Sequence, residues 1–596
     1  MRFMFHNMGR YRGRITGTMA LKFLAGIAEL MLPYILEHLI DDIVPTGEMR
    51  LVILWGSIMI LSAGICAFLN ITSNRFACNN AHLVTYDVRQ ELFEKTANLS
   101  GSQVDHFGLP SLTSRMISDS YNVQGFVQAF QTICVRAPFI LAGGIIVTMT
   151  LDPVLSAILC AMLPPLFLIV FTVSRKGIPL FNKVQVSLDK VVRIMRENIT
   201  GIRVVKALTK SEYEKARFSD ANEDMMKTNI RASRLMAIPG PTMQIFLNTG
   251  LVIVVLVGAH RVDSGLMKPG VILAFLTYFN MILFSVGALN RIFMMMSKAT
   301  ASADRIREVM EVEDDQPVLG PEEAKQPSGE GFIRFEHVNF RYRKREGVTG
   351  IFTDVSAGDS RDAEYGGEQE NCLTDMDFTI RRGESLGIIG PTGCGKSTIL
   401  NLLMRFYDVE DGGVFVDGKD VRSYEKDDLR RRFGVVFQND TIFNQTLREN
   451  IAFGRCVEEA DIWQATDDAM VGGYLRELEE GLDYMADIKG ANLSGGQKQR
   501  LLISRALVGK PEILILDDSS SALDYKTDAA LRGAISRNYE GVTTIMVAQR
   551  VSSLQNMTHI LVMEDGKTIG YGTHEELLAT CPYYRDVFES QMGSLA

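Results

Sequence analysis

The chain has 596 residues, with 62 Lys and Arg against 71 Asp and Glu, which gives a formal net charge of -9. This length exceeds what one hydrophobic core supports, so we expect two or more domains. The acidic balance argues against a nucleic-acid-binding protein, and the 8 cysteines, which show no CxxC spacing, indicate core residues in a reducing compartment rather than a disulfide framework or a metal site.

The N-terminal half contains long apolar runs separated by polar segments. Six of these runs approach the roughly 20 apolar residues that cross about 30 Å of hydrocarbon. The first follows the basic stretch MRFMFHNMGRYRGR and is too long for a signal peptide, with no small-residue cleavage site, so it predicts a membrane helix. The expected spans are residues 15–43, 51–72, 130–150, 153–173, 237–262 and 271–296.

Two polar stretches with helical periodicity separate the second span from the third and the fourth from the fifth. Basic residues concentrate in them and at the N-terminus, and the positive-inside rule therefore places all three in the cytoplasm. We expect a multi-pass protein of the plasma (inner) membrane with both termini cytoplasmic. The basic residues that carry this prediction are Arg75, Arg89, Arg115, Arg175, Lys176, Arg193 and Arg196.

The first span carries charged side chains, among them Lys22, Glu29 and Glu37. Charge inside a membrane is costly, so one interpretation places these residues along a substrate path. The alternative places them near the ends of a helix that protrudes from the bilayer, where they snorkel or pair. The Met- and Phe-rich stretches FNMILF and RIFMMM suit adaptable apolar contacts, with a substrate or within the bundle.

A polar, Pro-containing stretch, DDQPVLGPEEAKQPSGEG, separates the membrane half from the strand-like GFIRFEHVNFRY. This composition is typical of a linker between domains. We therefore expect a membrane domain over residues 1–310, a linker over 311–330 and a second domain over 331–596.

The segment SLGIIGPTGCGKSTILNLL combines a β-rich run, a Gly-rich loop and the start of a helix, which is the context of a G-x-x-x-x-G-K-[ST] phosphate loop. Its glycines let backbone N–H groups converge on a phosphate, and the following helix adds its positive end. Lys396 is expected to reach the β- and γ-phosphates of ATP and Ser397 to ligate Mg²⁺. The expected ATP-binding residues of this loop are Gly390, Thr392, Gly393, Cys394, Gly395, Lys396, Ser397 and Thr398.

Two further segments suit the same chemistry. ILILD is an apolar strand that can present Asp517 to the metal, and its pairing with the phosphate loop makes this prediction specific. LSGGQKQR has a Ser and two Gly that can cradle phosphate oxygens at a helix start. An ordinary Ser N-cap with a Gly turn explains LSGGQKQR equally well.

The phosphate loop, Gln438 in VVFQND, LSGGQ, ILILD and SALD follow six membrane spans, an arrangement that resembles an ABC exporter half-transporter over essentially the whole chain. The resemblance implies a multidomain membrane protein, in which an all-α domain of six transmembrane helices precedes an α/β P-loop nucleotide-binding domain. It also implies that two chains associate and hold two ATP molecules between them. Segments around 108–114 and 208–215 are similar to the coupling helices that dock the membrane domain on nucleotide domains.

The resemblance also assigns residues to the ATP sites. It implies that Tyr342 stacks on adenine and that Gln438 approaches Mg²⁺ and the membrane domain. Asp524 is expected in the loop that crosses the dimer interface. The residues expected to bind the γ-phosphate held by the partner chain are Ser494, Gly495, Gly496 and Gln497.

The chain departs from the family at two catalytic positions. In members of the family, the residue after the metal-ligating Asp is a Glu that polarises the attacking water, and a His lies near the γ-phosphate. This chain has Asp518 and Gln549 at these positions. Asp is one methylene, about 1.5 Å, shorter than Glu, and a general base must lie within roughly 2.6 to 3.2 Å of its proton. Misplacement of that order costs on the order of 100-fold in rate. Gln549 donates a hydrogen bond but never carries imidazolium charge.

The resemblance therefore implies a degenerate site that holds Mg-ATP and cleaves it slowly. Because LSGGQ is intact and serves the other chain's nucleotide, we expect a heterodimer similar to the asymmetric bacterial multidrug exporters, whose partner has the Glu and the His and a deviating signature. A homodimer with two slow sites is the alternative. ADIKGANLSGG also lacks the acidic residue that is often found a few positions before the LSGGQ signature. Residues 343–371 form a longer connection than is usual in the family, and this insertion is either regulatory or inert.

The expected function is ATP-driven export of amphipathic or hydrophobic compounds, of multidrug type, by alternating access. The expected partners are a second half-transporter, the lipid bilayer and a hydrophobic small-molecule substrate. Lipid or peptide export is one alternative, because no cargo-processing domain is visible. A mainly regulatory ATP-binding subunit is another.

Overall fold

The computed structural model describes residues 2–320, 322–342, 371–519 and 523–592. It divides into two compact units, which are described separately. The membrane unit contains the residues up to Asn98 and Gly108–Val312, and the nucleotide unit contains Leu99–Phe107 and the described residues from Glu313 onward.

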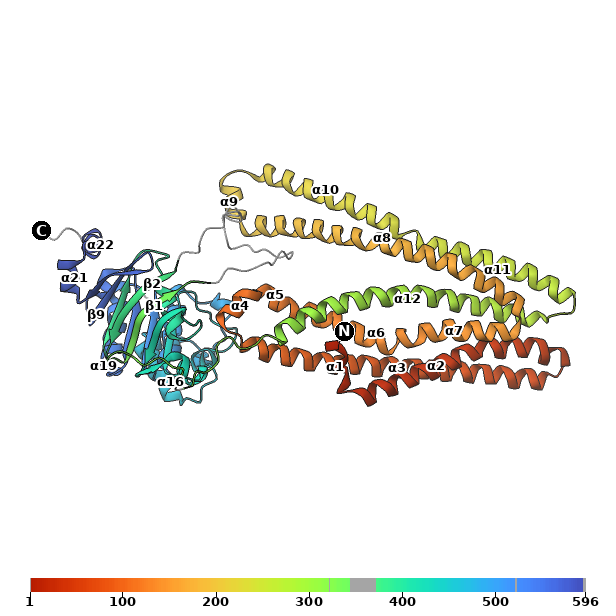
Figure 1. The fold of residues 1–596 in the computed structure, drawn as a ribbon, viewed down its shortest axis with the longest axis horizontal. Coiled ribbons are helices and arrows are strands. Elements are labelled where there is room, and N and C mark those ends of the chain that lie inside the picture. Colours follow the sequence, from red (N-terminus) through yellow and green to blue (C-terminus); the bar gives the residue numbers. More distant parts are fainter. Residues whose placement is uncertain (1, 321, 343–370, 520–522, 593–596) are drawn as a thin grey trace. The chain divides into compact units, whose positions relative to one another are not determined.

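All the regular elements among the described residues of the membrane unit are helices (Figure 1). Six segments are long and apolar enough to cross a membrane, and each predicted span lies within one of them, which confirms the prediction: Arg12–Thr46, Met49–Ala97, Leu109–Leu151, Pro153–Gly177, Ser211–Asp263 and Pro269–Met310. The helices of this unit are α1 (Arg2–Gly9), α2 (Arg12–His38), α3 (Met49–Ala97), α5 (Leu109–Ser114), α6 (Ser120–Gln131), α7 (Ile133–Leu151), α8 (Pro153–Thr200), α9 (Ile202–Ala207), α10 (Ser211–Met236), α11 (Pro239–Asp263) and α12 (Pro269–Met310).

Helix α12 is the packing centre of this unit. Its buried face contacts α2 and α7 through Tyr278 and contacts α7, α8 and α11 around Phe279 and Ile282. Small residues let these helices approach closely, since a Cβ on Gly144 of α7 would lie 2.9 Å from the Ile282 side chain.

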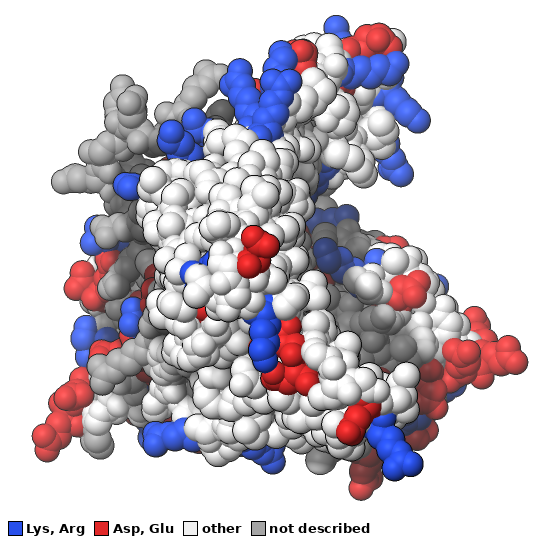
Figure 2. Space-filling model, turned by 90° about the vertical axis from the view of Figure 1, so that its right-hand side faces the viewer, with Lys and Arg blue, Asp and Glu red and all other residues white. Residues whose placement is uncertain are grey.

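The outer surface of the membrane unit is apolar. Large hydrophobic side chains of α3 such as Ile60 and Phe68 are 74% and 68% exposed, as suits a surface that faces lipid. Figure 2 looks onto the helix ends at the right of Figure 1 and shows mostly residues other than Lys, Arg, Asp and Glu, with a few charged groups near the middle.

The nucleotide unit is built on two sheets. The six-stranded sheet has the order β10-β9-β3-β8-β7-β6, parallel except for the antiparallel edge strand β10, and the four-stranded antiparallel sheet has the order β2-β1-β4-β5. The strands are β1 (Ile333–Phe340), β2 (Leu373–Ile380), β3 (Ser385–Ile389), β4 (Asp411–Val416), β5 (Lys419–Asp420), β6 (Phe433–Val436), β7 (Ile513–Asp517), β8 (Thr543–Val547), β9 (His559–Glu564) and β10 (Lys567–Gly572).

Helices pack against these sheets and complete the α/β fold, which confirms the predicted fold class. They are α4 (Gly101–Phe107), α13 (Lys396–Leu403), α14 (Lys426–Arg431), α15 (Leu447–Ala452), α16 (Glu459–Asp468), α17 (Gly472–Glu477), α18 (Gly495–Leu507), α19 (Tyr525–Asn538), α20 (Val551–Leu554), α21 (His574–Thr580) and α22 (Pro582–Met592). Strands β3 and β7 both pair with β8 in parallel, so the segments after them reach the same edge of the sheet.

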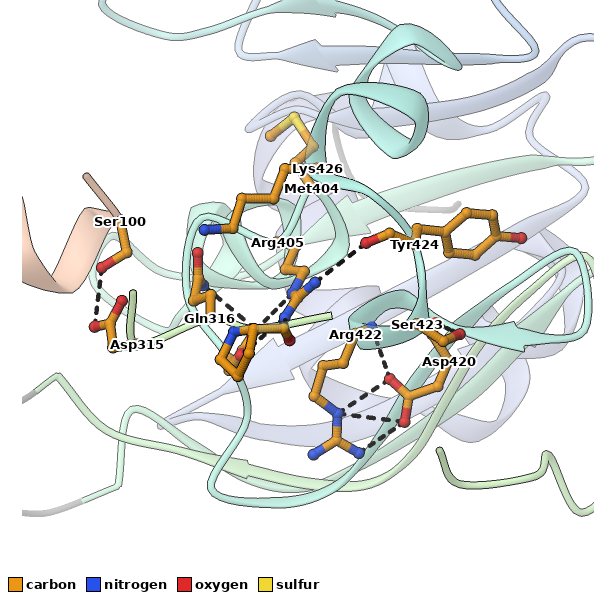
Figure 3. Close-up of polar contacts among 12 residues, drawn as sticks. Ser100, Asp315, Gln316, Met404, Arg405, Asp420, Arg422, Ser423, Tyr424 and Lys426 are labelled. Atoms are coloured by element: carbon orange, nitrogen blue, oxygen red, sulfur yellow. Dashed lines mark hydrogen bonds and ion pairs between the residues drawn. The ribbon is translucent and has the colours of Figure 1, made fainter. Parts of the chain in front are cut away.

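Between the end of α12 and β1 the chain is held on the nucleotide unit by Arg405, which is fully buried (Figure 3). The guanidinium donates to the Pro317 carbonyl at 2.7 Å and to Asp408 Oδ1 at 3.1 Å. Lys426 Nζ donates to Asp314 Oδ1 at 2.8 Å. A buried guanidinium needs several such acceptors, so Arg405 fixes the path of this connecting segment.

The short helix α4 also packs on the nucleotide unit, although it lies within the membrane half of the sequence. Gly101 N donates to the Phe406 carbonyl at 3.0 Å, and the Tyr407 hydroxyl donates to Asp105 Oδ2 at 2.6 Å. A Cβ on Gly101 would lie 2.8 Å from the Phe406 oxygen, so only glycine permits this approach. Burial and the Asp105 carboxylate raise the pKa of the Tyr407 phenol.

The predicted first coupling segment, 108–114, is therefore displaced by several residues. The docked segment is Leu99–Phe107, whereas 108–114 begins α5 in the membrane unit. The contacts of Gly101 with the Phe406 carbonyl and of Asp105 with the Tyr407 hydroxyl hold the earlier segment on this unit. The second predicted segment, 208–215, forms the turn after α9 and the start of α10. Its docking stays a prediction.

Candidate functional site

The phosphate loop connects β3 to α13, and its shape depends on glycine. Gly393 and Gly395 have φ of +89° and +97°, a left-handed conformation that side chains disfavour. At Gly390 a Cβ would lie 2.3 Å from the Met563 carbonyl oxygen. Cys394 is buried beneath the loop, where burial raises the pKa of its thiol. The loop is therefore tight enough for its backbone N–H groups to face an anion.

Ser397 and Asp517 meet at the end of this loop. The Ser397 hydroxyl donates to Asp517 Oδ2 at 3.0 Å, and Asp517 is 4% exposed at the end of the fully buried strand β7. Burial is the main reason that the pKa of Asp517 is raised. A hydroxyl beside a carboxylate suits Mg²⁺, which binds through one or two protein oxygens and completes its shell with water and phosphate oxygens.

No group of three or more His, Cys, Asp or Glu side chains in the described ranges is placed to hold a metal ion. Ser397 and Asp517 would hold Mg²⁺ together with the phosphates of a nucleotide. Lys396 is kept near the loop, since its Nζ donates to the carbonyls of Gly390 at 2.9 Å and Pro391 at 2.7 Å. The two carbonyl oxygens carry no formal charge, so the charge of Lys396 is not neutralised by them.

These groups surround one cavity of about 200 Å³. Its lining contains ten residues that the sequence predicts for the ATP site: Thr392, Gly393, Gly395, Lys396, Ser397, Thr398, Gln438, Asp517, Asp518 and Gln549. Cys372, Val547 and Ala548 also line it and were missed. No sequence pattern indicates Cys372, because the pairing of its strand brings it to the cavity. Val547 and Ala548 directly precede Gln549, so their position in the sequence could have indicated them.

Asp518 and Gln549 contact each other at this cavity. Gln549 Nε2 donates to Asp518 Oδ2 at 3.4 Å, and the Asp518 backbone has a φ of +50° with its N–H donating to the Val547 carbonyl at 3.0 Å. Burial raises the pKa of Asp518, against the opposing effect of Lys396. The amide therefore contacts one of the two oxygens of the carboxylate that stands at the position of the general base.

Tyr342 lies beside this cavity rather than in its lining. Its hydroxyl is 3.3 Å from Thr398 Oγ1, and its ring packs edge-on against Tyr407 with centroids 5.1 Å apart. The ring thus belongs to an aromatic cluster that borders both the phosphate loop and helix α4. Stacking on adenine stays a prediction, and residues 343–370 lie outside the described residues.

The LSGGQ segment begins helix α18 and is not part of the cavity lining. Ser494 N donates to Gln497 Oε1 at 2.8 Å and the Ser494 hydroxyl accepts from Gln497 N at 3.3 Å, which forms a capping box. The ordinary N-cap interpretation is therefore correct for the local geometry. It leaves the hydroxyl proton of Ser494 available for a phosphate oxygen, with the exposed Gly495 beside it and Gly496 following.

Asp524 caps helix α19 in a similar way. Its Oδ1 accepts from Thr527 N at 2.9 Å and its Oδ2 from Thr527 Oγ1 at 2.7 Å. These hydrogen bonds, the backbone one first, lower the pKa of Asp524. Its place at a dimer interface stays a prediction.

We expect Asp517→Asn to raise the melting temperature of the nucleotide-free protein at neutral pH. Because the pKa of Asp517 is raised in the folded state, ionising this carboxyl destabilises the fold as the pH rises above the ordinary Asp value of about 3.9. The gain should shrink as the pH is lowered toward that value, and thermal unfolding across pH measures it.

The same variant should lose the stabilisation that Mg-ATP gives the wild type, because an amide is a poor Mg²⁺ ligand. The control is Asp524→Asn, which is exposed, has its pKa lowered and keeps a good helix cap, so its melting temperature should change little. A lower melting temperature for Asp517→Asn at neutral pH contradicts the prediction.

Comparison with known proteins covers both units. Residues 15–286 match the family model for the ABC transporter transmembrane region, and residues 373–521 match that for ABC transporter. The chain is 33% identical over 566 residues to the ABC transporter ATP-binding protein YfiB of Bacillus subtilis (strain 168), covering 95% of this chain and 94% of the relative. It is 28% identical over 583 residues to an ATP-dependent lipid A-core flippase of Syntrophus aciditrophicus (strain SB), covering 97% and 92%.

A solved structure of a bacterial Atm1-family ABC exporter with ATP bound has the same fold. The match covers 98% of this chain and 99% of that chain, with a TM-score of 0.78 at 21% identity.

Proposed function

Because the chain belongs to the ABC transporter family, we propose that it is one half of a heterodimeric exporter whose own ATP site hydrolyses slowly. The chain is an exporter half-transporter, with a multi-pass membrane domain fused to an ATPase domain that is coupled to transport. Exporters of this kind act as dimers in the membrane. We propose in addition that the partner is a different chain, that the two ATP sites differ in activity and that the substrates belong to one chemical class.

One observation carries the proposal: Asp518 and Gln549, which the resemblance matches to the Glu and His of exporters in this family, are hydrogen-bonded to each other at the ATP cavity. The shorter carboxylate reaches less far, and the amide binds one of its oxygens. The phosphate loop, Ser397 and Asp517 keep their binding geometry. The site on this chain therefore binds nucleotide and is poor at activating water.

The binding residues act as follows. The loop N–H groups and Lys396 hold the β- and γ-phosphates, while Ser397 and Asp517 would hold Mg²⁺, which neutralises phosphate charge when bound. Ser494 and the glycines after it donate to the γ-phosphate on the partner. Closure of the two nucleotide domains pulls on α4, which Gly101 and Asp105 fix to Phe406 and Tyr407 in the turn after α13.

Through α4 the closure reaches the membrane helices, and the bundle turns its substrate path outward. Hydrolysis at the partner's phosphate loop, completed by LSGGQ of this chain, resets the pair. We place both termini and the two long loops in the cytoplasm, and the protein in the plasma membrane, with residues 1–310 as membrane domain, 311–330 as linker and 331–596 as nucleotide domain. The exported compounds are amphipathic or hydrophobic.

The similarity to a protein named as a lipid A-core flippase favours lipid export as the second candidate. The alternative of a mainly regulatory subunit rests on the same Asp518–Gln549 contact, with the slow site gating the partner rather than turning over.

The test is ATP turnover by the purified chain alone and by the complex that copurifies with it from native membranes. We expect the chain alone to release phosphate at a rate on the order of 100-fold below that of the complex, because of the misplaced base. Asp518→Ala in the complex should leave turnover within several-fold. Brisk turnover by the chain alone, at the rate of the complex, contradicts the proposal.

A further inference from the structure

A cavity of about 890 Å³ lies within the membrane unit. It is bordered by α2, α3, the junction of α6 and α7, and α12, helices that pack side by side in Figure 1. Its volume is at the upper end of the roughly 300 to 1,000 Å³ of sites for drug-sized ligands, so one amphipathic molecule fits. Lys22 and Glu29, two of the charged residues of the first span, line it, and Glu37 does not.

Lys22 places an ammonium group at this cavity, and no carboxylate among the residues that the structure describes pairs with it. The side chain is 5% exposed, and its Nζ donates to Asn70 Oδ1 at 2.8 Å and to Asn74 Oδ1 at 3.0 Å. An ammonium has three N–H donors, and no described residue accepts the third. The two amides orient the charge, but they do not neutralise it.

Glu29 does not neutralise Lys22, because it is committed to another cation. Arg136 donates to both Glu29 oxygens, with Nε to Oε2 at 3.0 Å, and the two side chains form a fork-to-fork ion pair. This pair contributes a neutral element to the cavity wall. The interpretation of Glu29 as a paired residue is therefore correct, and it also faces the cavity.

Arg291 adds a second cation to the lining, from α12. Its side chain is exposed, and it has no hydrogen bond or ion pair with any residue in the described ranges. With Lys22 and Arg291 uncompensated and Glu29 paired with Arg136, the cavity wall carries an excess of two positive charges.

The remaining lining is apolar or neutral. Leu276, Met281 and Phe284 of α12 face it together with Ile133 of α7. Uncompensated cations at membrane depth are costly, and an anion that enters the cavity would remove that cost. A molecule with an anionic head and an apolar body matches both parts of the wall.

We propose that this cavity binds amphipathic anions, whose acidic head lies between Lys22 and Arg291 and whose apolar body lies along Phe284. The inference rests on the proposed export function and adds the charge of its substrate. Sulfonates, carboxylates and phosphates share this chemistry, whether they come from a soluble amphiphile or from an anionic lipid headgroup.

The test uses the complex copurified with this chain, reconstituted in proteoliposomes. Two dansyl-labelled dodecyl probes differ only in their head, one sulfonate and one trimethylammonium, and a third probe is fluorescent phosphatidylglycerol. We expect ATP-dependent transport of the sulfonate about 10-fold faster than of the ammonium probe, as one charge-assisted hydrogen bond would give. Movement of phosphatidylglycerol as well assigns the lipid headgroup as a source, and movement of the sulfonate without it assigns a soluble amphiphile. Both outcomes support the proposal.

Two substitutions locate the effect. Lys22→Gln should raise the KM for the sulfonate on the order of 10-fold, and Lys22→Arg should restore it, because the guanidinium keeps the charge. Arg291→Gln should act in the same direction, and since its side chain is exposed it serves where Lys22→Gln fails to fold. The matched control is Lys298→Gln, an exposed cation two turns further along α12 that does not line the cavity.

Equal or faster transport of the ammonium probe overturns the anion assignment while leaving the export function intact. So does an Arg291→Gln variant that behaves like Lys298→Gln. Failure of all three probes to move or to stimulate ATP turnover overturns the export function and this inference with it.

Discussion

Replacing Asp518 by Glu and Gln549 by His together is expected to raise ATP hydrolysis at this chain's phosphate loop on the order of 100-fold. The Glu carboxylate reaches one methylene further toward the attacking water. The His removes the amide that now donates to Asp518 Oδ2 at 3.4 Å. Together the two changes free the base and return it to hydrogen-bond range of its proton.

The measurement is steady-state phosphate release by dimers of the full chain with itself, in which each site is completed by the intact LSGGQ of the other copy. Light scattering establishes that wild type and variant are equally dimeric. Asp518→Asn with Gln549→His is the control and should stay at the wild-type rate, because an amide is no base. Since residue 518 has a φ of +50°, which Asp tolerates better than Glu, the faster variant should also melt at a slightly lower temperature. A double variant that is no faster than wild type would show that the slow site has another cause.

Gly495→Asp is expected to lower ATP turnover of the native complex by at least about 100-fold, the scale of losing a donor to a reacting oxyanion. A Cβ at this position meets no atom within 4 Å, and an acidic residue at the first position of α18 suits the helix dipole. The fold should therefore be unharmed. The loss comes from a carboxylate placed against the γ-phosphate of the partner's nucleotide.

Gly495→Ala is the matched control, with a side chain but no charge, and it should change turnover only a few-fold. Melting temperatures of both variants check that the fold is intact. In the same complex, Asp518→Ala separates the two roles of this chain, because it alters only the chain's own site. Equal effects of Gly495→Asp and Asp518→Ala would contradict the division of labour between the two ATP sites.

The six spans and the phosphate loop depend on local composition and spacing: an apolar run of sufficient length forms a helix in lipid, and glycines such as Gly393 and Gly395 are required where φ is positive. The place of Asp517 beside Ser397 also follows, because parallel strands bring their carboxyl ends to one edge.

Other features needed the tertiary structure. The docking helix was predicted several residues too late, since Gly101 and Asp105 owe their role to Phe406 and Tyr407, about three hundred residues away in the chain. The sequence left two interpretations of Ser494 open, an ordinary helix N-cap and a phosphate-binding turn, and the structure shows the N-cap geometry. The contact between Asp518 and Gln549 was invisible, although each residue was identified as unusual.

By itself, the sequence determined that this protein has six apolar segments long enough to cross a membrane and a phosphate loop between a strand and a helix, because these depend on residues close together in the chain. Only the tertiary structure decided which charges remain unpaired. Glu29 is seven residues from Lys22 in the sequence, yet it pairs with Arg136 and leaves Lys22 to two amides of α3, since helix packing selects partners by distance in space.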